Sequence, residues 1–322
     1  MNTTSRSIVL YGDYSAKQAG RLEGLLGSAY SIKSVPYGLP AEEIAAALAQ
    51  ARVMVANVFG KADPAVPNLS FLQSPSAGIE GIDASTLPRA CQVRAVGGHE
   101  IPMAEYAICT ILDWQIGYQK QLSLLKSGQW SQKHWIKGDI HGEAFGSTLG
   151  IVGFGRIGRE ISRRALALGM HVRALSRWSK PEEMGPIAKF TIDGTNAFLS
   201  DCDFVVVTLP LDENTMGLVN ADWFGAMKPN AVLINIGRGK VVDEAALYSA
   251  LREKRIRGAT IDVWFNYPDS IDVEVPMAAY PFHELDNIVV TPHCSGRTNE
   301  MFERRWKEIA KNLVSYFTST QQ

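Results

Sequence analysis

Three polar side chains in the last third of the sequence have the chemistry of a catalytic site. They follow three separate apolar runs: Arg238, Asp262 and His293. The guanidinium of Arg238, between two glycines, can bind a carboxylate and a neighbouring carbonyl oxygen together. The imidazole of His293 changes charge near neutral pH and so suits proton exchange with a substrate. Each has an ordinary alternative, a structural ion pair for Arg238 and a backbone hydrogen bond for His293, but together they predict chemistry on a small acid.

A glycine-rich turn in the middle of the chain is the second chemical feature. Apolar residues over 149–152 predict a short buried strand, and residues 159–168 predict a helix. Three glycines lie between them: Gly153, Gly155 and Gly158. Such glycines permit a tight turn, a close approach of the backbone to a pyrophosphate, and close packing of helix on strand. The turn predicts a dinucleotide site at a helix N-terminus, with an ordinary strand-to-helix turn as the alternative.

The residues after the next predicted strand bear on the choice of cofactor. Residues 170–175 predict that strand, and Ser176, Arg177 and Lys180 follow it. NAD-binding sites usually place an acidic residue here, about 20 residues beyond the glycine turn, to bond the ribose 2′-hydroxyl. No acidic residue is present, whereas Arg177 and Lys180 can meet a 2′-phosphate. The sequence therefore favours NADP over NAD, with a plain surface role for Arg177 as the alternative.

Alternating strands and helices are expected to position these side chains. Beyond the glycine turn, strands are predicted over residues 204–209, 231–236, 258–263 and 288–291. The first hundred residues predict strands over 8–13, 51–58 and 68–73 and a helix over 41–50. Further helices are predicted within 97–127, over 243–254 and over 298–317, with an irregular stretch over 128–147. This alternation is typical of α/β domains, and ligands bind where their parallel strands end.

Length and composition exclude several classes of protein. A chain of 322 residues, 46% of them hydrophobic, predicts a globular protein of two domains. A net charge of −1 gives no field that attracts nucleic acid or a membrane surface, so neither is an expected partner. No apolar run approaches about 18 residues and the first residues are polar, so neither a transmembrane helix nor a signal peptide is expected. Four scattered cysteines without metal-ligand spacing predict a cytoplasmic protein with reduced thiols and no metal site.

A loop rich in small residues is predicted over residues 74–83. Ala77 and Gly78 within it can turn their backbone N–H groups toward a small anion. On this segment alone, a plain surface turn is the better interpretation.

Seven short segments occur in an order that is far more specific than any one of them. They are Ser-Ala-Gly-Ile-Glu-Gly-Ile-Asp (76–83), Met-Ala-Glu-Tyr (103–106), Gly-Phe-Gly-Arg-Ile-Gly (153–158), Leu-Pro-Leu-Asp-Glu-Asn-Thr (209–215), Asn-Ile-Gly-Arg-Gly (235–239), Ile-Asp-Val-Trp (261–264) and Thr-Pro-His-Cys-Ser-Gly (291–296). In them the chain resembles the D-isomer-specific 2-hydroxyacid dehydrogenase family over nearly its whole length. The resemblance implies two Rossmann-like or flavodoxin-like α/β domains, with a doubly wound nucleotide domain (99–292) inserted into a substrate domain (1–98 plus 293–322). It also implies a cleft between the domains and a homodimer.

The resemblance implies roles for individual residues as well. Arg238 would bind the substrate carboxylate and polarise the keto oxygen, and His293 would donate the proton in reduction or accept it in oxidation. Ala77 and Gly78 would contact the carboxylate through backbone N–H groups. The positions that match the family's cofactor contacts are Gly153, Gly155, Arg156, Ile157, Gly158, Ser176, Arg177, Leu209, Pro210, Thr215, Ile236, Gly237, Asp262, His293 and Gly296.

Two positions depart from the family pattern. The glutamate that usually pairs with the histidine is Tyr267 here, with Asp269 as a nearby carboxylate. Because tyrosine is uncharged at neutral pH, His293 is expected to protonate at lower pH than in relatives with the glutamate. The segment 262–268 is instead similar to the formate dehydrogenase branch, but that branch has an asparagine where this chain has His99.

Three functions remain open on the sequence. The favoured one is reduction of a small 2-keto acid such as glyoxylate or hydroxypyruvate, since the Ser176-Arg177 pair resembles NADP-using reductases of these acids. The second is hydride abstraction of the formate dehydrogenase type, which needs no proton transfer. The third is a nucleotide-sensing, corepressor-like binding protein, and the retained Arg238 and His293 argue against it.

Overall fold

The computed structural model describes residues 6–126, 128–138, 140–177, 187–268 and 273–320. Its contacts divide the chain into two compact units, Met1–Gly98 with Thr298–Gln322, and His99–Arg297. The expected return to the first unit was at residue 293, and it occurs at Thr298. The intervening loop stays with the second unit because buried Asp262 accepts hydrogen bonds from the backbone of Cys294 and Ser295.

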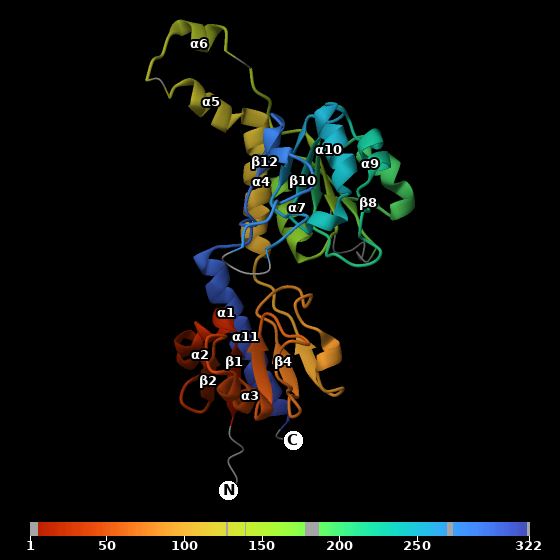
Figure 1. The fold of residues 1–322 in the computed structure, drawn as a ribbon. Coiled ribbons are helices and arrows are strands. Elements are labelled where there is room, and N and C mark those ends of the chain that lie inside the picture. Colours follow the sequence, from red (N-terminus) through yellow and green to blue (C-terminus); the bar gives the residue numbers. More distant parts are fainter. Residues whose placement is uncertain (1–5, 127, 139, 178–186, 269–272, 321–322) are drawn as a thin grey trace. The chain divides into compact units, whose positions relative to one another are not determined.

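The first unit is a parallel sheet with helices on both faces (Figure 1). Its strands are β1 (Ser7–Tyr11), β2 (Ser31–Val35), β3 (Val53–Ala56), β4 (Phe71–Gln73) and β5 (Gln92–Arg94), in the order β2-β1-β3-β4-β5. Its helices are α1 (Asp13–Ala16), α2 (Ala19–Leu26), α3 (Ala41–Ala49) and α11 (Asn299–Ser319), with a 3₁₀ turn at Ala84–Thr86. This is the strand order of flavodoxin-like folds.

Neighbouring residues of strand β1 point to opposite faces of the first sheet. Val9 and Tyr11 pack with helix α3, whereas Ile8 and Leu10 pack with α2 and α11. Because both faces are covered, the inner strands are apolar except for Ser7 and Gln73 at their ends, which is why their sequences predict strands. The edge strands β2 and β5 are largely exposed and carry no apolar run, so the sequence pattern missed them.

Helix α11 returns the chain to the first unit, as the family resemblance implies. The hydroxyl of Thr298 accepts a hydrogen bond from Met301 N–H at 3.1 Å and so caps the first turn. Trp306, Ile309 and Leu313 are completely buried against the sheet. Burial of an aliphatic side chain of this size contributes about 1.5–3 kcal/mol, so this face accounts for the docking of the helix.

The second unit is a seven-stranded parallel sheet in the order β12-β11-β10-β9-β6-β7-β8. The strands are β6 (Thr148–Val152), β7 (His171–Leu175), β8 (Ala188–Phe190), β9 (Phe204–Val207), β10 (Val232–Asn235), β11 (Gly258–Ile261) and β12 (Ile288–Val290). The helices are α4 (Glu100–Ile116), α5 (Tyr118–Leu124), α6 (Gln132–Ile136), α7 (Arg156–Ala167), α8 (Thr195–Leu199), α9 (Ala221–Ala226) and α10 (Glu244–Arg252). Short 3₁₀ turns occur at Ile192–Gly194, Gly239–Val241 and Phe282–Glu284.

The order of this sheet reverses between β6 and β9, which is the Rossmann arrangement and confirms the predicted doubly wound fold. Helices α4 and α7 cover one face of the sheet, and α8, α9 and α10 cover the other (Figure 1). Helix α10 begins where its sequence predicts, because the Asp243 carboxylate accepts the Ala246 N–H at 2.8 Å.

Two stretches differ from the prediction. The helical stretch within 97–127 is two helices, because Gly117, with a φ of 67°, ends α4 in the left-handed region. The stretch 128–147, predicted to be irregular, contains α6. In the described part of the chain, no helix combines the length and apolar character needed to cross a bilayer.

Candidate active site

The turn between β6 and α7 has the shape of a nucleotide cradle. Gly153 has a φ of 94°, in the left-handed region that suits glycine. A Cβ on Gly158 would lie 2.4 Å from the carbonyl oxygen of Gly153, so helix and strand pack too closely for any side chain. A Cβ on Gly155 would have no neighbour within 4 Å. The space above Gly155 is open, and Arg156 and Ile157 begin the helix beside it.

The end of β7 places Ser176 and Arg177 at the same sheet edge. Ser176 N–H donates to Phe190 O of β8 at 3.1 Å, which fixes the backbone of the turn. The guanidinium of Arg177 is about half exposed and lies 3.8 Å from the Asp212 carboxylate, an ion pair that solvent weakens. Lys180, the other predicted phosphate contact, lies outside the described residues.

The loop after β9 is shaped by a buried threonine. The hydroxyl of Thr215 donates to Pro210 O at 2.7 Å and accepts from Asp212 N–H at 2.8 Å. Thr215 is 3% exposed, so its hydroxyl turns into its own loop. Leu209 and Pro210 at the start of that loop are at least partly exposed, and a Cβ on Gly237 would lie 2.6 Å from Leu209 O. The loops after β9 and β10 therefore pack backbone to backbone.

Arg238 stands in a turn that the side chain of Asn235 organises. The amide of buried Asn235 donates to Arg238 O at 3.0 Å and accepts from Gly237 N–H at 3.1 Å. Ile236 between them is buried. A Cβ on Gly239 would lie 2.1 Å from a backbone oxygen of the neighbouring segment, so the turn tolerates only glycine after the arginine. The guanidinium donates from Nη1 to Gly237 O at 2.9 Å.

Asp262 anchors the loop that carries His293. Its carboxylate is completely buried and accepts three hydrogen bonds, from Thr291 Oγ1 at 2.6 Å, Cys294 N–H at 2.8 Å and Ser295 N–H at 2.9 Å. A buried carboxylate needs such donors, because an unpaired charge away from water is costly. The loop is therefore held on both sides of His293.

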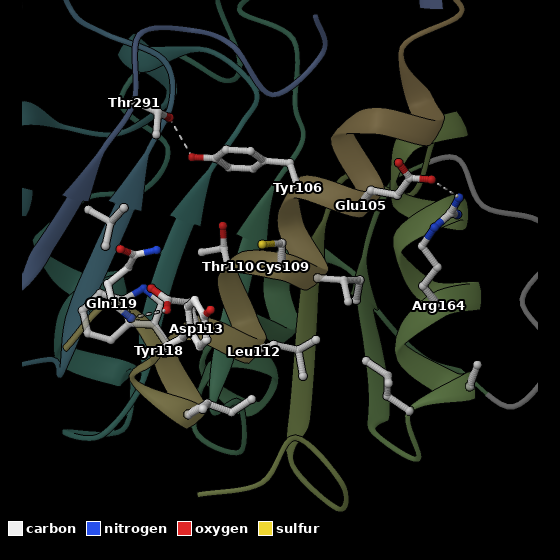
Figure 2. A pocket seen from close by; sticks show the side chains of 16 residues that line it. Glu105, Tyr106, Cys109, Thr110, Leu112, Asp113, Tyr118, Gln119, Arg164 and Thr291 are labelled. Carbon is white, nitrogen blue, oxygen red and sulfur yellow. Dashed lines mark hydrogen bonds and ion pairs between the residues drawn. The ribbon is translucent and has the colours of Figure 1, made fainter. Parts of the chain in front are cut away.

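Helix α4 and the segment after β11 reinforce this loop. The Thr291 hydroxyl donates its one proton to Asp262, so the Tyr106 hydroxyl, 2.7 Å away, donates to Thr291 (Figure 2). Burial raises the pKa of Tyr106 to about 12, which keeps it a donor at neutral pH. The indole of Trp264 donates to Thr291 O at 3.0 Å. Gly296, at the far end, packs close to α4, since its Cβ would lie 3.2 Å from that of His99.

His293 is set at an unusual backbone angle and faces Tyr267. Its φ of 54° lies in the left-handed region that few residues other than glycine adopt. Its Nδ1 lies 2.9 Å from Tyr267 Oη. Desolvation lowers the pKa of His293 below its ordinary value, and the charges of Arg238 and Arg297 act in the same direction against the opposing charge of Asp262.

Arg238, Asp262 and His293 are thus brought together, as the sequence predicts, because β10, β11 and β12 are neighbours in the sheet. The influence of Arg238 and Asp262 on the pKa of His293 reflects this proximity. Asp269, the alternative carboxylate partner, lies outside the described residues.

Ala77 and Gly78 lie in a loop of the first unit. The Ser74 hydroxyl donates to Gly78 O at 3.1 Å and holds the loop closed. Among the described residues, no hydrogen-bond acceptor is recorded for the N–H of Ala77 or Gly78. A Cβ on Gly78 would collide with the Glu80 carboxylate, so this side chain folds over Gly78 and places a negative charge beside the loop.

Comparison with known proteins identifies the family of this chain. The family model described as D-isomer specific 2-hydroxyacid dehydrogenase, NAD binding domain, matches residues 109–295. The chain belongs to the D-isomer-specific 2-hydroxyacid dehydrogenase family. Members of this dehydrogenase family are NAD(P)-dependent oxidoreductases that act on CH–OH groups, and the predicted family is confirmed.

Two curated 2-hydroxyacid dehydrogenases illustrate the likeness. The glyoxylate reductase of Pyrococcus furiosus is 33% identical over 265 residues, which cover 78% of this chain and 73% of that protein. The D-3-phosphoglycerate dehydrogenase of Archaeoglobus fulgidus is 31% identical over 253 residues, which cover 78% of this chain and 46% of that protein. The chain spans about half the length of several curated relatives that it matches.

A solved 2-hydroxyacid dehydrogenase shares the fold. It is the NADPH-dependent glyoxylate/hydroxypyruvate reductase of Sinorhizobium meliloti, in complex with NADP and sulfate, with a TM-score of 0.72 and 22% identity over 98% of this chain and 96% of that chain. At this identity the likeness concerns the fold alone.

Sequence reasoning missed the residues that hold the His293 loop. Tyr106 and Thr291 are 185 positions apart, and no local pattern pairs them. Trp264 stood in a matched segment, yet its indole hydrogen bond to Thr291 O depends on how β11 and β12 align.

Proposed function

We propose that this protein catalyses the reduction of a small 2-keto acid, of the size of glyoxylate or hydroxypyruvate, to the D-2-hydroxy acid, with NADPH preferred over NADH. One observation carries the proposal. Arg238 and His293 follow two strands, β10 and β12, that flank β11, and buried Asp262 between them anchors the histidine loop. Reduction of a keto acid requires a group that binds the carboxylate and a group that donates a proton, and an arginine beside a histidine provides this pair.

The glycine turn fits a dinucleotide. The open space over Gly155 and the first N–H groups of α7 suit a pyrophosphate, because these donors lack partners within the helix. The proposed cofactor contacts are Gly153, Gly155, Arg156, Ile157, Gly158, Ser176, Arg177, Leu209, Pro210, Ile236, Gly237, Asp262, His293 and Gly296, with Thr215 shaping the loop. When bound, the nicotinamide cofactor supplies the hydride.

The chain's own residues would bind the acid and move the proton. Arg238 offers a guanidinium for the carboxylate and the keto oxygen, and the N–H groups of Ala77 and Gly78 offer further donors to the carboxylate. His293 donates a proton to the keto oxygen as negative charge develops there. Stabilising that charge by donors already in place is usually a large part of catalysis.

Arg177 supports the preference for NADP. It follows β7 at the position where NAD sites carry an acid, and the described turn offers Ser176 and Arg177 instead. Its only ion pair among the described residues, with Asp212, is long and exposed, so the guanidinium can turn to a phosphate at little cost. The S. meliloti structure, which shares the fold, is described with NADP.

Turnover of a substrate panel tests the proposal. Oxidation of NADPH is followed by absorbance with glyoxylate, hydroxypyruvate and larger 2-keto acids, and reduction of NADP with formate. We expect turnover with the small keto acids and none with formate. Turnover with formate alone would favour formate dehydrogenase chemistry, and tight cofactor binding without any turnover would favour a nucleotide sensor.

We also propose that the protein is a cytoplasmic homodimer. Its four cysteines are free thiols, as in a reducing compartment. The α4 face carries an apolar groove of about 870 Å³, which Tyr106, Ile108, Leu112 and Leu168 help to line (Figure 2). The segment after α4 exposes Trp130, Trp135, Ile136 and Ile140. Exposed apolar patches of this extent favour a partner, and in a twofold dimer each groove can take the apolar segment of the other copy.

Light scattering after size exclusion measures the assembly. We expect twice the chain mass of 35.3 kDa, and the chain mass for Ile116→Glu, which places a charge in the groove. Val314→Glu, at a similarly exposed apolar residue of α11, is the matched control and should stay dimeric. A monomeric wild type contradicts the assembly and leaves the proposed reaction untouched.

A further inference from the structure

The hydroxyl of Tyr267 makes two hydrogen bonds, one of them to His293, the proposed acid. Its hydroxyl lies 2.9 Å from His293 Nδ1, and it accepts the backbone N–H of Trp264 at 3.1 Å. The two rings meet edge to face, with centroids 5.6 Å apart and planes at 64°. The histidine is therefore hydrogen-bonded through Nδ1. Among the described residues, no partner of its Nε2 is recorded.

The donors and acceptors of this arrangement can be counted. A tyrosine hydroxyl has one proton to donate and two lone pairs. Trp264 N–H occupies one lone pair. Burial raises the pKa of Tyr267 above its ordinary value, so the hydroxyl keeps its proton at neutral pH. Among the described residues, Nδ1 of His293 is the one recorded acceptor for that proton.

A carboxylate at position 267 would impose the opposite arrangement. A carboxylate only accepts, so it requires a proton on Nδ1 and leaves Nε2 of a neutral imidazole without one. The Tyr267 hydroxyl keeps its proton, and Nδ1 is the one recorded acceptor for that proton among the described residues, so the hydroxyl donates to a bare Nδ1. The proton of a neutral imidazole then resides on Nε2.

We propose that Tyr267 is a positioning residue that holds neutral His293 with its proton on Nε2. This inference rests on the proposed function for its meaning, because Nε2 is the nitrogen left to face a substrate. With Tyr267 in place, His293 presents an N–H to a keto oxygen in both its charged and its neutral form. With a carboxylate there, the neutral form would present a lone pair.

The surroundings keep the histidine ring in this position. Asp262 accepts hydrogen bonds from the Thr291 hydroxyl before His293 and from the backbone of Cys294 and Ser295 after it, and the Trp264 indole donates to Thr291 O at 3.0 Å. The segment 262–267 thus contacts the ring itself through Tyr267 and holds its loop through Asp262 and Trp264. The charged groups that act on the ring are Asp262, Arg238 and Arg297, and none of them replaces the hydroxyl as a partner of Nδ1.

Nitrogen NMR of the histidine rings tests the proposal on the full-length protein without substrate or cofactor. The chain has six histidines. The resonances of His293 are assigned as those that are absent from the spectrum of His293→Asn. At pH about 8, where His293 is neutral because its pKa is lowered, we expect a pyrrole-type Nε2 and a pyridine-type Nδ1. The Nδ1 resonance should be shielded, since it accepts a hydrogen bond.

Three variants sharpen the test. Tyr267→Phe keeps the ring and removes the donor, so Nδ1 should move downfield. Tyr267→Glu should exchange the two nitrogen types and place the proton on Nδ1. Tyr280→Phe is the control. It removes a tyrosine hydroxyl in the same unit, from a ring that stacks on Tyr248, and should leave the His293 resonances unchanged.

A proton on Nδ1 in the neutral wild type, or a Tyr267→Phe spectrum identical to it, overturns the proposal. If Tyr267→Phe fails to fold, the spectra of the wild type and of Tyr267→Glu still test the proposal. Because no substrate is present, expected spectra in a protein that reduces no keto acid would overturn the proposed function and leave this positioning role standing.

Discussion

The guanidinium of Arg177 lies 3.8 Å from the carboxylate of Asp212, and both side chains are about half exposed. A pair at this distance in contact with solvent contributes at most about 1 kcal/mol. The arginine is therefore held weakly, at the end of the strand where a nicotinamide cofactor presents its ribose.

The first prediction concerns cofactor choice. NADPH should exceed NADH in kcat/KM, because a 2′-phosphate offers Arg177 a doubly charged partner. Ser176→Asp should shift the ratio toward NADH by about tenfold or more, since a hydrogen bond to a charged group contributes roughly 1.5–3 kcal/mol. Steady-state kinetics with both cofactors measure it, and Arg252→Ala, an exposed arginine of α10, is the control. Equal efficiency in the wild type would contradict the assignment of Arg177.

Replacing Arg238 with alanine should raise KM for the keto acid and lower kcat. The guanidinium would hold the carboxylate in the ground state, and lost hydrogen bonds of this kind cost roughly 1.5–3 kcal/mol, or about 10- to 100-fold. Arg238→Lys keeps the charge but loses the planar fork, so it should recover only part of the loss. An unchanged KM in both variants would exclude Arg238 from carboxylate binding.

Replacing His293 should act mainly on kcat. Removal of a general acid typically costs about 10²–10⁴-fold. Because His293 has a φ of 54°, His293→Asn is the better variant, since asparagine tolerates this region and alanine does so poorly. Initial rates with saturating keto acid measure the loss. Near-normal reduction by His293→Asn would show that the proton comes from elsewhere.

The pH profile should fall at lower pH than an ordinary histidine would give. As the proposed acid, His293 must be charged to donate its proton, and desolvation lowers its pKa below the usual 6.5, so we expect kcat/KM to fall as pH rises through that lowered value. Tyr267→Glu places an opposite charge beside Nδ1 and should raise the pKa, moving the fall toward neutrality. Profiles of kcat/KM against pH for the two proteins measure this. Superimposable curves would mean that residue 267 has no influence on the acid.

Asp262→Asn should destabilise the second unit. Both carboxylate oxygens accept hydrogen bonds from the loop, Oδ1 from Thr291 and Cys294 and Oδ2 from Ser295. An amide nitrogen in either place faces a donor, which costs roughly 1–3 kcal/mol for each unpaired group. Thermal unfolding should show a lower Tm, whereas Asp286→Asn, at an exposed aspartate, should not. An unchanged Tm would show that the anchor contributes little.

Local patterns in the sequence determined the fold class and much of the site. The glycine turn, the apolar strands and the Asp243 cap depend on residues within a few positions of one another, so their spacing can be recognised along the chain. Parallel strands all end at one edge of a sheet. The positions of Arg238, Asp262 and His293 directly after predicted strands were therefore enough to predict that they lie near one another.

Only the tertiary structure decided which groups these residues touch. The complete burial of Trp306 depends on packing against residues far away in the sequence. The edge strands β2 and β8 form by pairing with β1 and β7, and no local pattern encodes this pairing. The hydroxyl of Thr215, at a position that matches a cofactor contact of the family, donates within its own loop, which no motif reveals. The family resemblance already implies that Tyr267 stands opposite His293, but the hydrogen bond between them depends on the register of β11 and β12. A hydrogen bond depends on tenths of an ångström and on direction, and both are set by the packing of the sheet.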